Sequence, residues 1–303
     1  MRLGDYRTSD NVDDQRGQSF GGGFGGGGGV FGLILSLVAS RFGIGGVLIL
    51  ALGYCALSSL GGLGGGGPVG VTPQQSTKAG NNAVESCAVD AASRLSCQVL
   101  ANTEDVWAKL YSVQGERYAP AGFVFYGGTG QSGCGVAQSA MGPFYCPTDN
   151  RIYLDTSFFN ELQNRFGAAG DFAQAYVIAH EVGHHLQALT GVLDQAHSAQ
   201  QRLSSREGNA LQVKVELQAD CYAGVWGANA KDSKGQPLLE PGDVEEGLRA
   251  AEAIGDDTLQ RQSQGRVVPE SFTHGSSAQR IQWLRRGLET GDPKACDTFN
   301  TAI

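Results

Sequence analysis

The sequence has little positive charge: 22 lysine and arginine residues stand against 30 aspartate and glutamate residues, and no basic run occurs. A net charge of −8 with no basic patch argues against a nucleic-acid-binding protein. A Gly-X-Y repeat is also missing, which excludes a collagen-like fibre. No C-x-x-C pair occurs, which argues against a zinc site built from cysteines.

Glycine, in contrast, is abundant, and its distribution divides the chain. Of the 46 glycines, 20 fall between residues 17 and 67. Residues 1–29 are polar or almost pure glycine and cannot bury enough apolar surface to become ordered, so they predict a disordered cytoplasmic tail. From residue 82 onward the apolar and aromatic content is that of one globular domain, 82–303, joined through a flexible linker at 61–81.

Residues 1–81, which precede the globular domain, are called the leader here. Its apolar part, residues 30–60, predicts one transmembrane helix. Its second part, 42–60, contains no charged residue and would be about 28 Å long as a helix, close to the roughly 30 Å hydrocarbon core of a bilayer. Four arginines precede the end of this apolar part, whereas 61–80 offers only Lys78. The positive-inside rule therefore predicts a cytoplasmic N-terminus and a domain on the opposite side of the membrane.

The cysteines agree with an exported domain, because disulfides persist in oxidising compartments. Cys55 lies in the expected span, and six others follow: Cys87, Cys97, Cys134, Cys146, Cys221 and Cys296. Six cysteines allow 15 pairings. A Cys134–Cys146 bridge is favoured by the loop-like segment between the two residues. Cys87 and Cys97 are too far apart along a continuous helix and can pair only if the chain bends between them.

Hydrophobic periodicity and turn signals predict a helix-rich α+β domain with a small sheet. Strands are expected at 121–126 and 151–155, and the turn sequence at 147–150 predicts a hairpin ending in the second of them. The expected helices are 82–113, 171–189, 207–230, 243–254 and 278–289.

The helix expected at 171–189 contains His180, Glu181 and His184 in the pattern His-Glu-x-x-His. Histidines four residues apart lie on the same helical face, so both imidazoles can reach one metal ion. Glu181 lies beside them and can accept a proton from water. With only five histidines in the chain, this spacing rarely arises by chance, and a polar helix face with incidental histidines is the weaker interpretation.

A catalytic zinc site needs a third protein ligand. A histidine six residues after His184 is excluded, since Thr190 occupies that position and Gln187 stands where the class has glycine. Glu216 is the predicted ligand, and Asp220, four residues later, is predicted to hold the free ring nitrogen of a histidine ligand. The alternative, a solvated helix face, is disfavoured because the surrounding sequence VKVELQADCYAGVW is mostly apolar.

HEVGHH followed by ELQAD resembles the glutamate-zincin metallopeptidases, of which thermolysin is the familiar member. More closely, the leader together with CGVAQSAMGPFYCP, IYLDTSFF, DFAQAYVIAHEVGHH, ELQADCYAGVW and FTHGSSAQR resembles the neutral zinc metallopeptidase family of bacterial membranes. The resemblance implies a zincin-like peptidase fold and a Zn²⁺ cofactor, but no particular substrate follows from it. A polypeptide substrate is expected from the predicted amide hydrolysis. With the leader, the resemblance implies a single-pass protein of the bacterial inner membrane whose catalytic domain is extracytoplasmic.

The predicted chemistry is zinc-assisted amide hydrolysis by an endopeptidase, with Glu181 as general base. His274, just before a Ser-Ser helix cap, is the candidate that stabilises the oxyanion, although a surface-loop histidine is the slightly stronger interpretation. His185 points about 100° away from the ligand face. The strand at 151–155, or its neighbour, could align an extended peptide by edge pairing.

Two other functions compete with the peptidase. One is a non-catalytic envelope protein that keeps a structural metal site. A purely structural site would have no use for the carboxylate of Glu181 beside the ligands. The other is a metal-dependent hydrolase of a cell-wall amide, whose cleft would need groups that recognise sugars. The three tryptophans, Trp107, Trp226 and Trp283, are all expected in the core instead.

Overall fold

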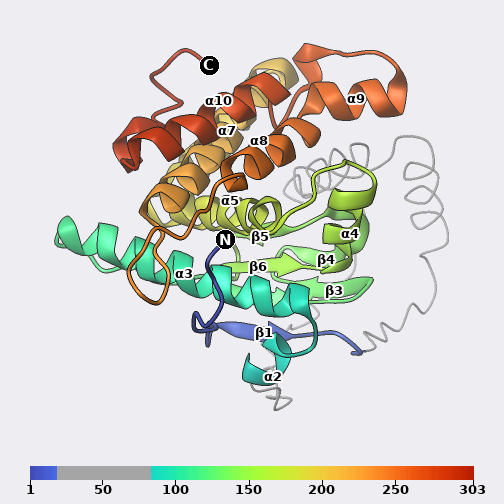
Figure 1. Cartoon of the computed structure of the whole chain (residues 1–303). Helices are drawn as coiled ribbons and strands as arrows, with labels where there is room; N and C mark the ends of the chain where they lie inside the picture. The colour runs from blue at the N-terminus through green and yellow to red at the C-terminus, as the bar shows by residue number, and fades with distance from the viewer. Residues whose placement is uncertain (19–82) are drawn as a thin grey trace, which may run out of the picture.

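A computed structural model describes residues 1–18 and 83–303 of the chain, and within these ranges it is a helix-rich α+β structure (Figure 1). The main sheet has the strand order β1-β2-β6-β5. Its strands are β1 (Val12–Asp14), β2 (Gly122–Phe125), β6 (Arg151–Leu154) and β5 (Phe144–Cys146). A two-stranded antiparallel sheet is formed by β3 (Thr129–Ser132) and β4 (Gly135–Gln138).

The helices of the described ranges form most of the structure. They are α2 (Ala83–Cys87), α3 (Ala91–Val113), α4 (Ser157–Asn164), α5 (Asp171–Leu189), α6 (Val192–Gln200), α7 (Ser205–Asn229), α8 (Asp243–Ala253), α9 (Asp256–Gln264) and α10 (Ser277–Thr290). Helix α5 contacts β5 and β6 on one side and α7 and α8 on the other. It thus lies between the sheet and the layer of α7, α8 and α10 (Figure 1).

Several expected elements are confirmed. Helix α5 has the bounds expected from its pattern, and α7, α8 and α10 differ from expectation by one or two residues at their ends. Strands β5 and β6 form the expected antiparallel hairpin. The three tryptophans are buried, as expected, with exposed fractions of at most 2%.

The single helix expected at 82–113 is wrong, because the chain breaks between α2 and α3. Asp90 caps α3 by accepting a hydrogen bond from the Ser93 amide at 2.6 Å. The break lets Cys87 and Cys97 form a disulfide with a Cα–Cα distance of 5.9 Å. The other two disulfides are Cys134–Cys146, the bridge favoured from the sequence, and Cys221–Cys296.

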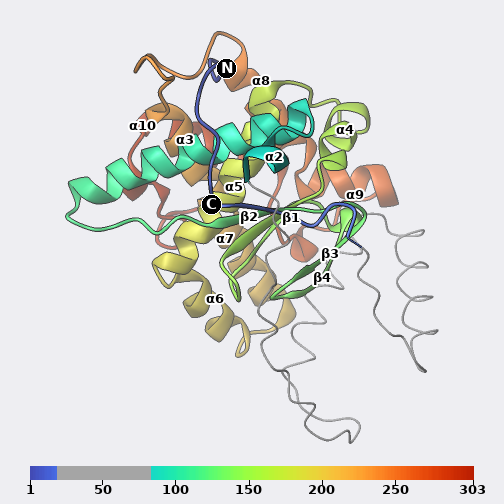
Figure 2. The ribbon, with the colours of Figure 1, turned by 90° about the horizontal axis from the view of Figure 1, so that it is seen from below.

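The expectation of a disordered tail is also wrong for residues 1–18, which are part of the fold. Strand β1 is parallel to β2, with Val12 opposite Phe123, and the Phe123 amide donates to the Asn11 carbonyl at 2.8 Å. Leu3 and Val12 are buried in the main core. Figure 2 shows the N-terminal segment crossing α3 before it reaches β1. The isolated apolar residues of this polar segment gave no periodic signal.

This pairing argues against the expected membrane topology. Strands joined by backbone hydrogen bonds must lie on the same side of any membrane, so the N-terminal segment and the domain cannot be on opposite sides. The rest of the tail, the apolar residues 30–60 and the linker at 61–81 lie outside the described residues. Among the residues that are described, no helix is both long enough and apolar enough to cross a bilayer.

Candidate metal centre

The candidate site lies where α5 crosses α7. Gly183, inside the His-Glu-x-x-His pattern, faces Ala219 on α7, and a Cβ atom at Gly183 would be only 2.9 Å from the Ala219 Cα and carbonyl oxygen. A larger residue would therefore push the two helices apart. This close approach brings His180 and His184 from α5 next to Glu216 from α7.

His180, His184 and Glu216, which we call the His–His–Glu group, could hold a metal ion. Their ligand atoms all lie within 4.8 Å of one another. Glu216 Oε2 is 3.2 Å from His180 Nε2 and 3.5 Å from His184 Nε2. The three side chains are largely buried, with exposed side-chain fractions of 8%, 14% and 8%. The structure thus brings together the three ligands expected from the sequence.

Asp220 lies behind His180, as expected, and it also binds a residue that the sequence analysis did not single out. Its Oδ1 is 2.8 Å from His180 Nδ1. Arg280 of α10 donates to both Asp220 oxygens at 2.9 Å, and the Tyr176 hydroxyl donates to Oδ1 at 2.6 Å. Burial would raise the pKa of Asp220, but the charges of Arg280 and His180 outweigh it and lower this pKa to about 2. The Asp220 carboxylate therefore accepts a hydrogen bond from His180 Nδ1–H, and the other ring nitrogen, Nε2, faces Glu216.

Gln187 contacts the ring nitrogen of His184 that faces away from Glu216, a role that the sequence pattern did not predict. Its Oε1 lies 2.8 Å from His184 Nδ1, and its Nε2 donates to the Val215 carbonyl at 2.7 Å. In metallopeptidases with a third histidine ligand, glycine occupies the position of Gln187. The same residue that separates this chain from that class therefore orients His184. Its spacing of three residues after His184, on the same helical face, is the signal that could have identified it.

The ligand side chains affect one another's pKa values strongly. Burial would lower the pKa of His184, but the charge of Glu216 and its hydrogen bond raise it from 6.5 to about 9. Burial likewise opposes ionisation of His180, yet Asp220 and Glu216 raise its pKa. Glu216 has a pKa well below its usual value, since the charge of His184 and the hydrogen bonds of both histidines outweigh its burial. The group therefore has an ionised carboxylate in contact with two imidazoles.

Glu181 is 7% exposed and lies close enough to His184 for its charge to raise the pKa of that imidazole. Within residues 1–18 and 83–303, its carboxylate has no hydrogen bond to another side chain or to the backbone. The carboxylate is thus free to accept a proton from a small molecule beside the His–His–Glu group.

His274 is brought to the same site by the segment between α9 and α10. Its Nδ1 is 3.3 Å from Asp256 Oδ1, and its backbone amide donates to Asp256 Oδ2 at 2.7 Å. Burial would lower the pKa of His274, but the hydrogen bond that its ring donates to Asp256 and the charge of Glu216 raise it. Asp256 therefore fixes the ring and favours its doubly protonated form, in which Nε2 is a donor.

The third histidine of the motif, His185, does not join the His–His–Glu group. It is 2% exposed, and its ring nitrogens lie 3.1 Å from the Tyr145 hydroxyl and 2.7 Å from the Ala119 carbonyl. Because Tyr145 belongs to β5, His185 connects α5 to the edge of the sheet.

The strand order decides which strand could pair with a peptide. Strand β6, expected at 151–155, lies between β2 and β5 and has no free edge. Its neighbour β5 forms the edge next to α5. Edge pairing by residues 151–155 is therefore excluded, whereas pairing by β5 is compatible with the sheet.

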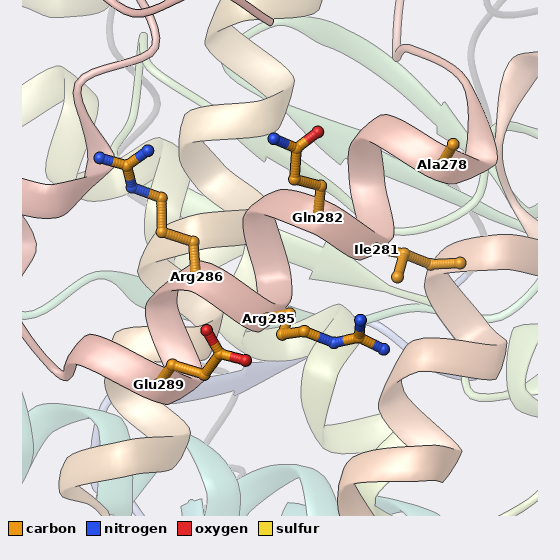
Figure 3. A pocket seen from close by; sticks show the side chains of 6 residues that line it. All are labelled: Ala278, Ile281, Gln282, Arg285, Arg286 and Glu289. Atoms are coloured by element: carbon orange, nitrogen blue, oxygen red, sulfur yellow. The ribbon is translucent and has the colours of Figure 1, made fainter.

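Two other features lie apart from this centre. Asp171, Asp243 and Glu246 also form a compact acidic group, but the Met1 amino group is 2.7 Å from Asp171 and 3.2 Å from Asp243, so a cationic group already lies against it. A shallow surface hollow follows the outer face of α10, where Gln282, Arg285, Arg286 and Glu289 project (Figure 3). Arg280 lies on the opposite, buried face of that helix.

Comparison with known proteins agrees with the geometry. The sequence model of the family described as putative neutral zinc metallopeptidase matches residues 1–299. The uncharacterized protein YpfJ of Escherichia coli strain K12 is 47% identical over 307 aligned residues that cover the whole of both chains. The uncharacterized protein Rv2575 of Mycobacterium tuberculosis strain H37Rv is 45% identical over 224 residues, covering 70% of this chain and 73% of that protein. No solved structure matches the chain.

Proposed function

Because this chain belongs to the putative neutral zinc metallopeptidase family, we propose that it is a zinc-dependent endopeptidase that hydrolyses polypeptides. The observation that carries the proposal is the spacing within the His–His–Glu group. Zinc bonds of 2.0–2.1 Å to nitrogen and oxygen in a tetrahedral arrangement separate neighbouring ligand atoms by roughly 3.3 Å. The distances from Glu216 Oε2 to the two imidazole nitrogens, 3.2 and 3.5 Å, bracket this value.

The donor set also fits zinc. Two imidazoles and one carboxylate are a ligand set of catalytic zinc sites, which keep a further position for water or substrate. When bound, zinc would supply a Lewis acid that polarises the scissile carbonyl and makes a water molecule more acidic. His180, His184 and Glu216 would hold it, with both histidine tautomers already selected by Asp220 and Gln187.

Glu181 is the proposed general base. Its carboxylate lies beside His184 and has no hydrogen bond to other described groups, so it can take the proton of the attacking water. The same carboxylic acid can then give that proton to the departing amine, which completes the cleavage of the amide bond.

His274 is the proposed donor to the oxyanion of the tetrahedral intermediate. Asp256 accepts from His274 Nδ1 and favours the imidazolium, whose Nε2 is then a charged donor. A preorganised donor of this kind stabilises the charge that develops in the transition state.

The edge strand β5 is the proposed docking strand for the substrate. An extended peptide that pairs with a sheet edge is held by its backbone, so this mode predicts little selectivity for side chains. His185 would support this arrangement, because its contact with Tyr145 fixes β5 relative to α5.

Anchoring in the bacterial inner membrane through residues 30–60 is part of the proposal, with the catalytic domain on the extracytoplasmic side. The three disulfides support an oxidising compartment. The N-terminal segment is proposed to lie on that same side, because β1 belongs to the sheet of the domain.

The test is the metal content of the purified full-length protein in detergent, compared with that of Glu216→Ala. We expect one equivalent of zinc in the native protein and much less in the variant. The full chain is needed, because a fragment starting near residue 82 would lack β1. A native protein that contains no metal after gentle purification would contradict the proposed zinc-dependent function.

Cleavage is then assayed on a peptide library, with Glu181→Gln as the control that keeps the His–His–Glu group. We expect cleavage by the native protein and none by the variant. Hydrolysis of cell-wall amides in place of peptides would contradict the proposed substrate class.

A further inference from the structure

The second oxygen of Glu216 has a partner that connects it to another helix. Gln212, one turn earlier on α7, donates from Nε2 to Glu216 Oε1 at 2.9 Å. Gln212 Oε1 in turn accepts from Gln200 Nε2 at 3.0 Å, and Gln200 is the last residue of α6. Gln200 also donates to the carbonyl oxygen of Gly208, at 3.3 Å. A chain of hydrogen bonds therefore runs from α6 to the carboxylate of Glu216.

Glu216, the last residue in this series of hydrogen bonds, determines which atom donates and which accepts in each bond. An ionised carboxylate can only accept hydrogen bonds, and a carboxylate that ligates a metal ion is deprotonated. Gln212 must therefore present its amide nitrogen to Glu216 and its amide oxygen to Gln200. Gln200 supplies the donor that this oxygen needs, so each amide is oriented by its neighbour.

The two oxygens of Glu216 thus face different partners. Oε2 faces the imidazole nitrogens of His180 and His184, whereas Oε1 is turned toward Gln212. A carboxylate can ligate a metal through one oxygen or through both. A hydrogen bond that occupies Oε1 favours one-oxygen ligation through Oε2 and leaves room for water and substrate.

We propose that Gln200 and Gln212 are positioning residues that hold Glu216 as a one-oxygen metal ligand. This inference rests on the proposed zinc site. Helix α6 lies in the long connection between His184 and Glu216. In this proposal its last residue, Gln200, helps to orient Glu216 through the oxygen that faces away from the histidines. Together with Asp220 behind His180 and Gln187 behind His184, the pair Gln200–Gln212 completes a set in which every proposed ligand is oriented by a side chain.

The test compares the full-length native protein with Gln212→Met and Gln200→Met. Both positions are half-buried, and methionine is a good helix former, so the variants should fold. Zinc affinity is measured by competition with a chelator, and the Co²⁺-substituted proteins are compared by visible absorption, whose intensity falls when cobalt gains ligands beyond four. Gln195→Met, on the exposed face of α6, is the matched control.

We expect Gln212→Met to lower zinc affinity by about 10–100-fold and to weaken the cobalt absorption. Gln200→Met should change both quantities in the same direction by a smaller factor, and Gln195→Met should change neither. Native affinity and a native cobalt spectrum in Gln212→Met would overturn the inference while leaving the zinc site intact. If the native protein itself binds neither metal, the proposed function fails, and with it the site that the two glutamines would serve.

Discussion

Each side chain of the His–His–Glu group is held on the side away from its neighbours, and the three holding groups differ in charge. Asp220, behind His180, is an anion that Arg280 neutralises. Behind His184 and Glu216 the partners are neutral amides. A single buried carboxylate therefore both orients a proposed ligand and balances a buried guanidinium, so its role in stability cannot be separated from its role at the metal.

The raised pKa of His184 predicts that zinc binding depends on pH. In the metal-free protein this pKa is about 9, so the imidazole carries a proton at neutral pH, and zinc must displace that proton. Apparent zinc affinity should therefore fall as the pH is lowered through 9, by about tenfold per pH unit for each proton released. It should level off above that pH.

Chelator competition between pH 6 and pH 10, on the native full-length protein, measures this dependence. An affinity that stays constant across the range would show that His184 is unprotonated in the metal-free protein. The pH profile of Glu216→Ala provides the control, because loss of the carboxylate charge should return the pKa of His184 toward its usual value.

At the scale of elements, the sequence predicted correctly those helices and hairpins whose formation depends on their own residues. Helix α5 has an apolar face at regular spacing and a glycine beyond its end, and its bounds were predicted correctly. Strand β1 was not predicted, because three residues of which two are acidic become a strand only by pairing with β2, more than a hundred residues later. Arg280 was missed for the same reason, since its contact with Asp220 depends on how α7 and α10 pack. Gln212 lies one turn before Glu216 on α7, a spacing that could have identified it, whereas its contact with Gln200 depends on how α6 and α7 pack.

The crossing of α5 and α7 gives a prediction about Gly183. Alanine there would place a Cβ atom 2.9 Å from backbone atoms of Ala219, which cannot move without shifting α7. We expect Gly183→Ala to destabilise the metal-free protein by about 1–3 kcal/mol through overpacking, partly offset by the roughly 1 kcal/mol that alanine gains over glycine in a helix. Zinc affinity should fall as well, because α7 carries Glu216.

The urea dependence of unfolding gives the free-energy change, and chelator competition gives the affinity. Gly208→Ala is the matched control, since a Cβ atom at this glycine of α7 would meet only a Gln200 side-chain carbon at 3.9 Å. That control should be neutral or stabilising. A Gly183→Ala protein with native stability and native affinity would mean that the helices can separate without disturbing the site.

At the scale of the whole molecule, the main sheet joins the N-terminal segment to the domain. The Phe123 amide donates to the Asn11 carbonyl, and the Gln15 amide donates to the Phe125 carbonyl at 2.7 Å, so we expect residues 11–15 and the domain to share one compartment. We expect Asp10→Cys and Glu116→Cys, both at exposed positions, to react alike with a membrane-impermeant maleimide in intact cells. Each substitution is made in a Cys55→Ser background, which removes the one cysteine outside the three disulfides.

The labelling has two informative patterns. If the domain is extracytoplasmic, both variants should be labelled before lysis. Labelling of Glu116→Cys alone would mean that the N-terminal segment stays in the cytoplasm, so that β1 cannot pair with β2 in the cell. Permeabilised cells, in which both positions must react, show that each introduced thiol is accessible, so that a missing label reports the compartment and not burial.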